Sequence, residues 1–93
     1  MRLVGKIILD QFARSHADTR VPLDAWICEV EDADWSEPSD VKSRYPSASL
    51  LPENTVIFNI KGNRYRLEVK VHYQLKVVTV SRVGTHAEYS SWK

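Results

Sequence analysis

Two stretches of alternating residues, joined by Gly62-Asn63, constrain the fold more than any other feature of the sequence. Apolar side chains occupy every second position over residues 56–60 and again over residues 64–72, which is the period of a β-strand. A two-residue turn with glycine at its first position is typical of a β-hairpin, and such a turn fixes the register of the two strands. Apolar residues then face each other at alternate positions. The predicted pairs are Ile60 with Tyr65, Asn59 with Arg66, Phe58 with Leu67, and Val56 with Val69.

Three segments before this hairpin predict helices. Apolar residues recur at helical spacing over residues 6–16 and 19–33, and Trp26 lies on the apolar stripe of the second segment, where we expect it to pack in the core. Residues 36–45 predict a third, shorter helix with Ser36 as its N-cap. These helices would cover the apolar face of the sheet.

Shorter elements complete the predicted architecture. Residues 2–4 predict a short strand, residues 47–54 a loop, and residues 77–83 a third strand of the meander. The segment 85–93 predicts a closing helix, since Thr85 and Glu88 have the spacing of a capping box. The expected fold class is α+β, with N-terminal helices packed on a small antiparallel sheet and a short C-terminal helix, in one domain spanning residues 1–93.

Charge is divided along the chain although the formal net charge is only +1. Residues 24–40 hold seven acidic residues and no lysine or arginine, whereas residues 61–82 hold six basic residues and one acid, Glu68. Two interpretations stay open: two ordinary solvated faces, or a basic platform for a phosphate backbone. The polar face of the predicted sheet carries Asn59, Lys61, Arg64, Arg66, Glu68, Lys70 and His72.

Several function classes do not fit the composition. The single cysteine, Cys28, has no partner for an internal disulfide, and we expect it to be a small buried residue. One cysteine and three scattered histidines match no zinc spacing. No apolar run is long enough to span a membrane, so the expected location is the cytoplasm.

A set of short segments, in order and at matching spacing over nearly the whole chain, resembles the HigB toxin family of type II toxin–antitoxin systems. The two longest segments are Phe58-Asn59-Ile60-Lys61-Gly62-Asn63-Arg64-Tyr65-Arg66-Leu67 and Val83-Gly84-Thr85-His86-Ala87-Glu88-Tyr89. The earlier segments Pro22-Leu23 with Trp26, Ala33-Asp34-Trp35, and Asp40-Val41-Lys42 are also similar.

The resemblance implies a RelE-like fold and an endoribonuclease that cleaves mRNA, often on the translating ribosome, and so inhibits translation. It implies a partner antitoxin of the HigA type, which is a helix-turn-helix DNA-binding protein. The toxin would contact operator DNA only through this antitoxin. Neither a metal nor another cofactor is expected. RelE-like enzymes tend to use lysine, arginine and tyrosine more than paired histidines.

The residues of the predicted polar face supply candidates for this chemistry. Metal-free cleavage of RNA needs a base for the 2′-hydroxyl, an acid for the leaving 5′-oxygen, and cations for the charge that builds on the phosphate. The catalytic candidates are Arg66, His86, Lys61 and Tyr89, and the RNA-binding candidates are Arg64, Asn59, Lys70 and Arg82. The alternatives are a surface ion pair for Arg66 with Glu68 or Glu88, solvation for Lys61 and Arg64, local hydrogen bonding for His86, and packing for Tyr89.

One departure from the family's pattern affects the site. An arginine usually stands at the position held here by Ser81, and here the arginine comes one residue later, at Arg82. Simple alternation turns Arg82 toward the core, unless a β-bulge or the sheet's edge restores it to the polar face. A catalytically weakened module that binds antitoxin or RNA without cleavage is therefore the alternative function.

Overall fold

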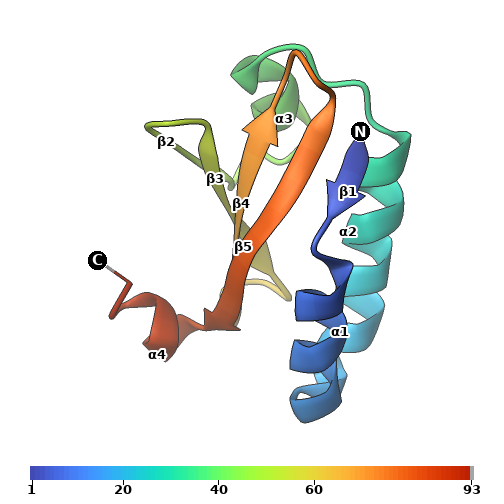
Figure 1. Cartoon of the computed structure of the whole chain (residues 1–93). Coiled ribbons are helices and arrows are strands. Elements are labelled where there is room, and N and C mark those ends of the chain that lie inside the picture. Colours follow the sequence, from blue (N-terminus) through green and yellow to red (C-terminus); the bar gives the residue numbers. More distant parts are fainter. Residues whose placement is uncertain (93) are drawn as a thin grey trace.

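The chain folds around one five-stranded sheet with strand order β1-β5-β4-β3-β2, and the computed structural model describes residues 1–92 (Figure 1). In chain order the elements are β1 (Arg2–Val4), α1 (Lys6–Ser15), the 3₁₀ helix η1 (Ala17–Thr19), α2 (Arg20–Asp32), α3 (Pro38–Arg44), β2 (Ser49–Leu51), β3 (Thr55–Ile60), β4 (Tyr65–His72), β5 (Val77–Thr85) and α4 (His86–Tyr89).

The central hairpin has the predicted register. β3 and β4 are antiparallel, and all four pairs expected from the Gly62-Asn63 turn are present. The backbone N–H of Arg64 donates to the carbonyl of Lys61 across this turn at 3.3 Å. The predicted α+β class, with N-terminal helices packed on a sheet and a short C-terminal helix, is confirmed.

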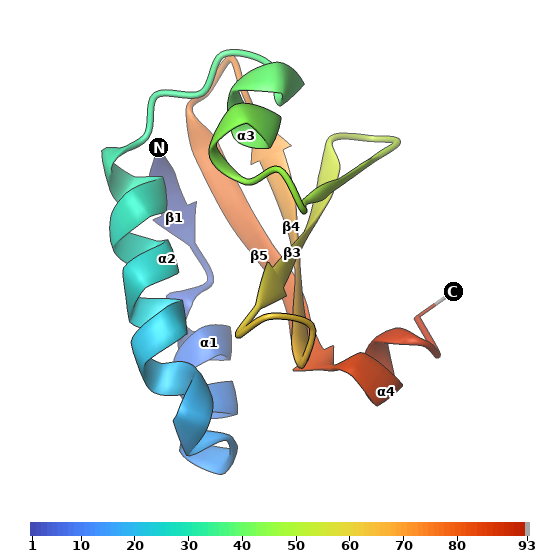
Figure 2. The ribbon, with the colours of Figure 1, turned by 180° about the vertical axis from the view of Figure 1, so that it is seen from behind.

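The first strand makes the sheet mixed rather than wholly antiparallel. β1 pairs with β5 in parallel, with Leu3 opposite Val78. Helix α1 follows β1 directly and continues in the same direction, and α2 then runs back beside α1 and β1 (Figures 1 and 2). The sequence predicted the strand but not its partner, because three residues carry no information about which distant strand they join.

One apolar cluster lies between the helices and the sheet. Phe58 is 1% exposed and meets the ring of Trp26 at a centroid distance of 5.4 Å. Trp26 is 2% exposed, which confirms its predicted place in the core. The cluster draws on β3, β4 and β5 on the sheet side and on Leu9, Leu23, Trp26, Val30 and Val41 on the helix side. The opposite face of the sheet is left for polar residues.

Four details differ from the sequence-based expectations. The N-cap of α3 is Glu37 rather than Ser36, because the Asp40 carboxylate accepts the backbone N–H of both residues. The expected loop at residues 47–54 contains β2, which extends the sheet beyond β3. Cys28 is exposed, since it lies two positions from both Trp26 and Val30 and so on the outer side of α2. The closing helix ends at Tyr89, and Lys93, its expected last residue, lies outside the described residues.

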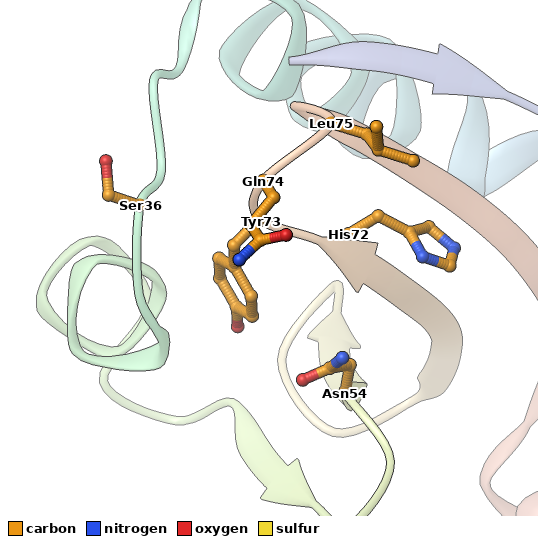
Figure 3. A pocket seen from close by; sticks show the side chains of 6 residues that line it. All are labelled: Ser36, Asn54, His72, Tyr73, Gln74 and Leu75. Carbon is orange, nitrogen blue, oxygen red and sulfur yellow. The ribbon is translucent and has the colours of Figure 1, made fainter.

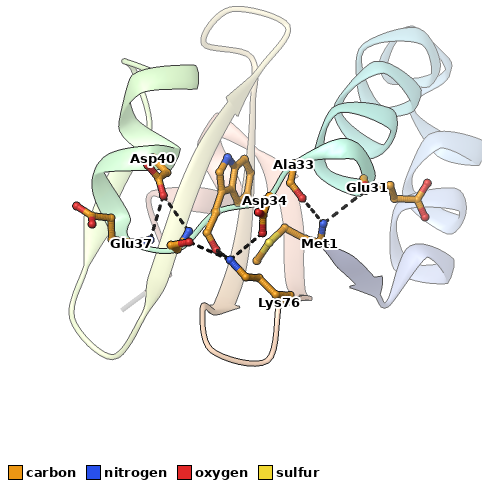
Figure 4. A network of polar contacts seen from close by, with 9 residues as sticks. Met1, Glu31, Ala33, Asp34, Glu37, Asp40 and Lys76 are labelled. Carbon is orange, nitrogen blue, oxygen red and sulfur yellow. Dashed lines mark hydrogen bonds and ion pairs between the residues drawn. The ribbon is translucent and has the colours of Figure 1, made fainter.

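Polar contacts fasten the segment after α2 to the sheet (Figure 4). The Lys76 ammonium donates to the carbonyl of Trp35 at 3.1 Å and lies 2.8 Å from the Asp34 carboxylate. The hydrogen bond that the Lys76 ammonium donates to the Asp34 carboxylate lowers the pKa of Asp34. The ammonium of Met1 donates to the carbonyl of Ala33. These contacts place α3 over the end of the core. Within residues 1–92, no helix has the length and apolar character needed to cross a bilayer.

Candidate functional site

A β-bulge at Ser81 determines where Arg82 lies. Glu68 pairs with Arg82 and Val69 pairs with Val80, so Ser81 has no partner of its own on β4. The extra residue resets the alternation, and Arg82 joins Glu68 on the polar face. Its Nε and Nη2 both donate to Oε1 of Glu68, at 3.3 and 3.2 Å. The β-bulge, one of the two possibilities that the sequence leaves open for Arg82, is therefore present, and Arg82 is not buried.

Helix α4 folds against the same polar face, on the side of the sheet away from α1 and α2 (Figures 1 and 2). The capping box predicted at its start forms, because the Thr85 N–H donates to Glu88 Oε1 at 2.8 Å and the Glu88 N–H donates to Thr85 Oγ1 at 3.1 Å. The first of these bonds lowers the pKa of Glu88. The backbone N–H of His86 donates to the carbonyl of Arg64 at 2.9 Å, which ties α4 to the hairpin.

Gly84 lets α4 approach the sheet closely. A Cβ atom at this position would lie 2.9 Å from Cζ2 of Trp92 and 3.2 Å from Cβ of Glu88. Glycine inside a strand is a signal for such an approach. This signal is present in the sequence, but it does not identify Trp92 as the neighbour of Gly84.

We expect Gly84→Val to displace the segment after β5 while the core stays folded. Valine is compatible with a strand, so the cost comes from the clash with Trp92 and not from the backbone. Overpacking of this kind lowers the free energy of unfolding by about 1–3 kcal/mol, which urea denaturation measures. Thr79→Val, on the same strand and the same face, is the matched control, and an equal loss in both variants would contradict the role of Gly84.

Two arginines and two aromatic rings meet under α4. The Cζ atom of Arg66 lies 5.2 Å from the ring centroid of Tyr89, and that of Arg82 lies 4.3 Å from the ring centroid of Trp92. The two rings touch edge to face, with centroids 5.6 Å apart. We call these four residues the arginine–aromatic cluster. The ring of His86 is exposed beside it, 6.4 Å from that of Tyr89.

The two arginines of the cluster differ in their partners. Nη1 of Arg66 donates to the carbonyls of Asn63 and Tyr65, at 2.9 and 3.3 Å. Over residues 1–92, Arg66 forms no ion pair with an acidic side chain, so neither predicted alternative, Glu68 or Glu88, is its partner. Arg82 instead is paired with Glu68. The free positive charge of the cluster therefore belongs to Arg66.

Lys61 and Arg64 lie on the helix side of the sheet, which corrects their predicted place on the polar face. Nζ of Lys61 is 3.3 Å and Nη1 of Arg64 is 3.7 Å from Oδ2 of Asp18, in η1. The hydroxyl of Tyr65 donates to the same carboxylate at 2.8 Å. Both cations belong to the hairpin turn, where strand alternation no longer decides the face.

Asp18 should make the stability of the chain depend on pH. The hydrogen bond from Tyr65, followed by the contact with Lys61, lowers the pKa of Asp18. A carboxyl with a lowered folded-state pKa stabilises the fold above its ordinary pKa, and this contribution is lost as the pH falls through the lowered value. Asp18→Asn should therefore lower the urea midpoint at about pH 7 but change it little at about pH 2. An equal difference at both pH values would contradict this assignment.

The other RNA-binding candidates are spread along the polar face. Asn59 lies opposite Arg66 in register and donates to the carbonyl of Ser47 at 3.4 Å. Lys70 lies two residues beyond Glu68 on β4 and donates to the carbonyl of Glu53 at 3.1 Å. The structure thus brings Arg66, Arg82, Tyr89 and His86 together, places Asn59 beside them, and separates Lys61, Arg64 and Lys70 from them.

The described residues also form a cavity away from this cluster. A cavity of about 430 Å³ lies at the end of the sheet opposite α4, and Figure 3 shows its lining: Ser36, Asn54, His72, Tyr73, Gln74 and Leu75. His72 is exposed there, as expected. Within residues 1–92, no group of three His, Cys, Asp or Glu side chains is placed to hold a metal ion. The arginine–aromatic cluster is an open surface, which suits an extended ligand better than a small molecule.

Comparison with known protein families agrees with the resemblance found in the sequence. A family model described as HigB toxin, the RelE-like toxic component of a toxin–antitoxin system, matches residues 19–92. The matched region includes the hairpin, the bulge and the whole arginine–aromatic cluster. The search of curated proteins gives no match. The match spans most of the chain, and the protein therefore belongs to the HigB family of RelE-like toxins.

Proposed function

We propose that this toxin is an endoribonuclease that cleaves mRNA on the translating ribosome and thereby inhibits translation in the cytoplasm. The observation that carries the proposal is the free guanidinium of Arg66, held against Tyr89 on an exposed polar face. An uncompensated cation at such a place can stabilise a developing negative charge. Membership of the family implies an antitoxin partner, and we propose that this partner is of the HigA type and alone contacts operator DNA.

The reaction proposed is attack of a ribose 2′-oxygen on the adjacent phosphorus. A base removes the 2′-hydroxyl proton, the bond from phosphorus to the 5′-oxygen breaks, and an acid protonates that oxygen. The products are a 2′,3′-cyclic phosphate and a 5′-hydroxyl end. Arg66 stabilises the additional charge on the phosphate oxygens, and its fork of N–H donors suits a phosphate. The reaction needs no redox partner and no metal ion.

His86 and Tyr89 are the groups near Arg66 that could move the two protons. Both belong to α4, and their rings are 6.4 Å apart. Histidine titrates near neutral pH and can serve as base or acid. A tyrosine hydroxyl can donate a proton, which suits the acid that protonates the leaving 5′-oxygen. We propose these roles for the pair, with His86 as base and Tyr89 as acid.

The experiment that tests the function follows the ends of cleaved mRNA. Induction of the toxin without its antitoxin should stop growth and shorten mRNA, and the new fragments should carry 5′-hydroxyl ends. Purified toxin should give the same fragments with translating ribosomes. Intact mRNA under both conditions would overturn the proposal, and fragments with 5′-phosphate ends would overturn the chemistry.

The alternative is a module that binds RNA or antitoxin without cleavage. The ion pair between Arg82 and Glu68 favours it, because a neutralised arginine contributes little to a charged transition state. A toxin that binds mRNA and leaves it intact in the same assay would establish this second function.

A further inference from the structure

We infer that Arg82 is a platform on which one RNA base stacks, and that it does not act as a phosphate-binding cation. The inference rests on the proposed function for its ligand, RNA, and assigns to Arg82 a part in recognising the bases. It starts from the contrast between the two arginines of the arginine–aromatic cluster.

The charge of Arg82 is already satisfied. Nε and Nη2 both donate to Oε1 of Glu68, whose side chain is only 18% exposed. A phosphate that approached Arg82 would have to compete with this carboxylate and would meet its negative charge. Arg66, which within residues 1–92 has no acidic partner and donates hydrogen bonds to backbone carbonyls, is the better cation for a phosphate.

The guanidinium of Arg82 is held in place by two neighbours, Trp92 and Glu68. Trp92 packs over Gly84, where even a Cβ atom would come within 2.9 Å of its ring. The guanidinium in turn lies over this ring, with Cζ 4.3 Å from its centroid. Gly84, the indole of Trp92 and the guanidinium of Arg82 are therefore in successive contact, and the two hydrogen bonds to Glu68 hold the guanidinium in one position.

The outer side of this stack is open. The side chain of Arg82 is 48% exposed although one side of its guanidinium covers Trp92 and its edge faces Glu68. A flat, delocalised and weakly hydrated group with a free face is the kind of surface on which RNA bases stack. Arg82 also lies close to Arg66 along the sheet. Arg66 pairs with Gly84, which is two positions from Arg82 on β5. A base on Arg82 would thus belong to a nucleotide next to the phosphate at Arg66.

The test uses a dye-labelled trinucleotide of 2′-O-methyl RNA, which lacks the 2′-hydroxyl nucleophile and cannot be cleaved by the proposed reaction. Binding is measured by fluorescence anisotropy over a series of salt concentrations from about 50 mM upward. A second series of trinucleotides carries an abasic residue at each position in turn. The variant is the double substitution Arg82→Gln with Glu68→Gln, which removes one charge of each sign and leaves the net charge unchanged.

If Arg82 is a base platform, the double variant should bind the trinucleotide about tenfold more weakly than the wild type. The slope of log Kd against log salt should be the same for both proteins, because no phosphate contact is lost. One abasic position should weaken binding to the wild type by about tenfold and should not weaken binding to the double variant further. Arg66→Ala should instead reduce the salt slope by about one.

Three results would overturn the inference. A salt slope reduced by about one in the double variant would make Arg82 a phosphate contact. Equal abasic penalties in both proteins at every position would show that no base lies on Arg82. Failure of the wild type to bind at about 50 mM salt would exclude the platform altogether. Binding by this pattern in a protein that leaves mRNA intact would support the platform while the proposed cleavage failed.

Discussion

Arg66→Ala is expected to lower the rate of mRNA cleavage by at least about 100-fold, the loss usual when one donor to a developing anion is removed. Arg66 is the cation of the arginine–aromatic cluster that has no acidic partner within residues 1–92. Its side chain is only partly buried and outside the apolar core, so the variant should fold. Single-turnover cleavage of mRNA on purified ribosomes measures the effect.

Arg14→Ala is the matched control for this prediction. Arg14 is also an arginine in an exposed position, paired with Asp10 on α1, on the other side of the sheet. The substitution changes the net charge by the same amount, so a general loss of electrostatic attraction to RNA would appear in both variants. If Arg14→Ala slows cleavage as much as Arg66→Ala, the charge of the protein and not the position of Arg66 is responsible.

The central hairpin could be predicted residue by residue, because two independent signals agreed there. The Gly62-Asn63 turn set the register, and the apolar alternation of the strands required the same register. The local capping signal of α4 was equally readable, since Thr85 and Glu88 are three residues apart. The sequence therefore predicts Arg66 and Tyr89 as candidates, but it does not predict the contact between them.

The sequence does not predict the correct face of the sheet for side chains at positions where the strand alternation stops. Lys61 and Arg64 were placed on the polar face by extending the strands into the turn, and the Asp18 carboxylate draws them to the other side. Arg82 could not be placed, because a bulge at Ser81 depends on pairing with β4 and leaves no mark in β5 itself. Contacts between distant segments, such as that of β1 with β5, are set by packing and not by local pattern.

Tyr89→Phe is expected to slow cleavage by about 100-fold, within the range that one general acid or base contributes. Phenylalanine keeps the ring that lies under the Arg66 guanidinium and beside Trp92, and it removes only the hydroxyl. A loss of activity would therefore follow from the missing proton donor and not from a collapsed cluster. It should appear in kcat more than in KM, because the hydroxyl acts on the leaving 5′-oxygen.

Tyr73→Phe supplies the control, since it makes the same chemical change in the cavity at the other end of the sheet and should leave cleavage unaltered. If Tyr89→Phe also cleaves at the rate of the wild type, Tyr89 serves only as the surface on which Arg66 rests. The proton for the 5′-oxygen must then come from another donor, such as a solvent water, since His86 is the proposed base.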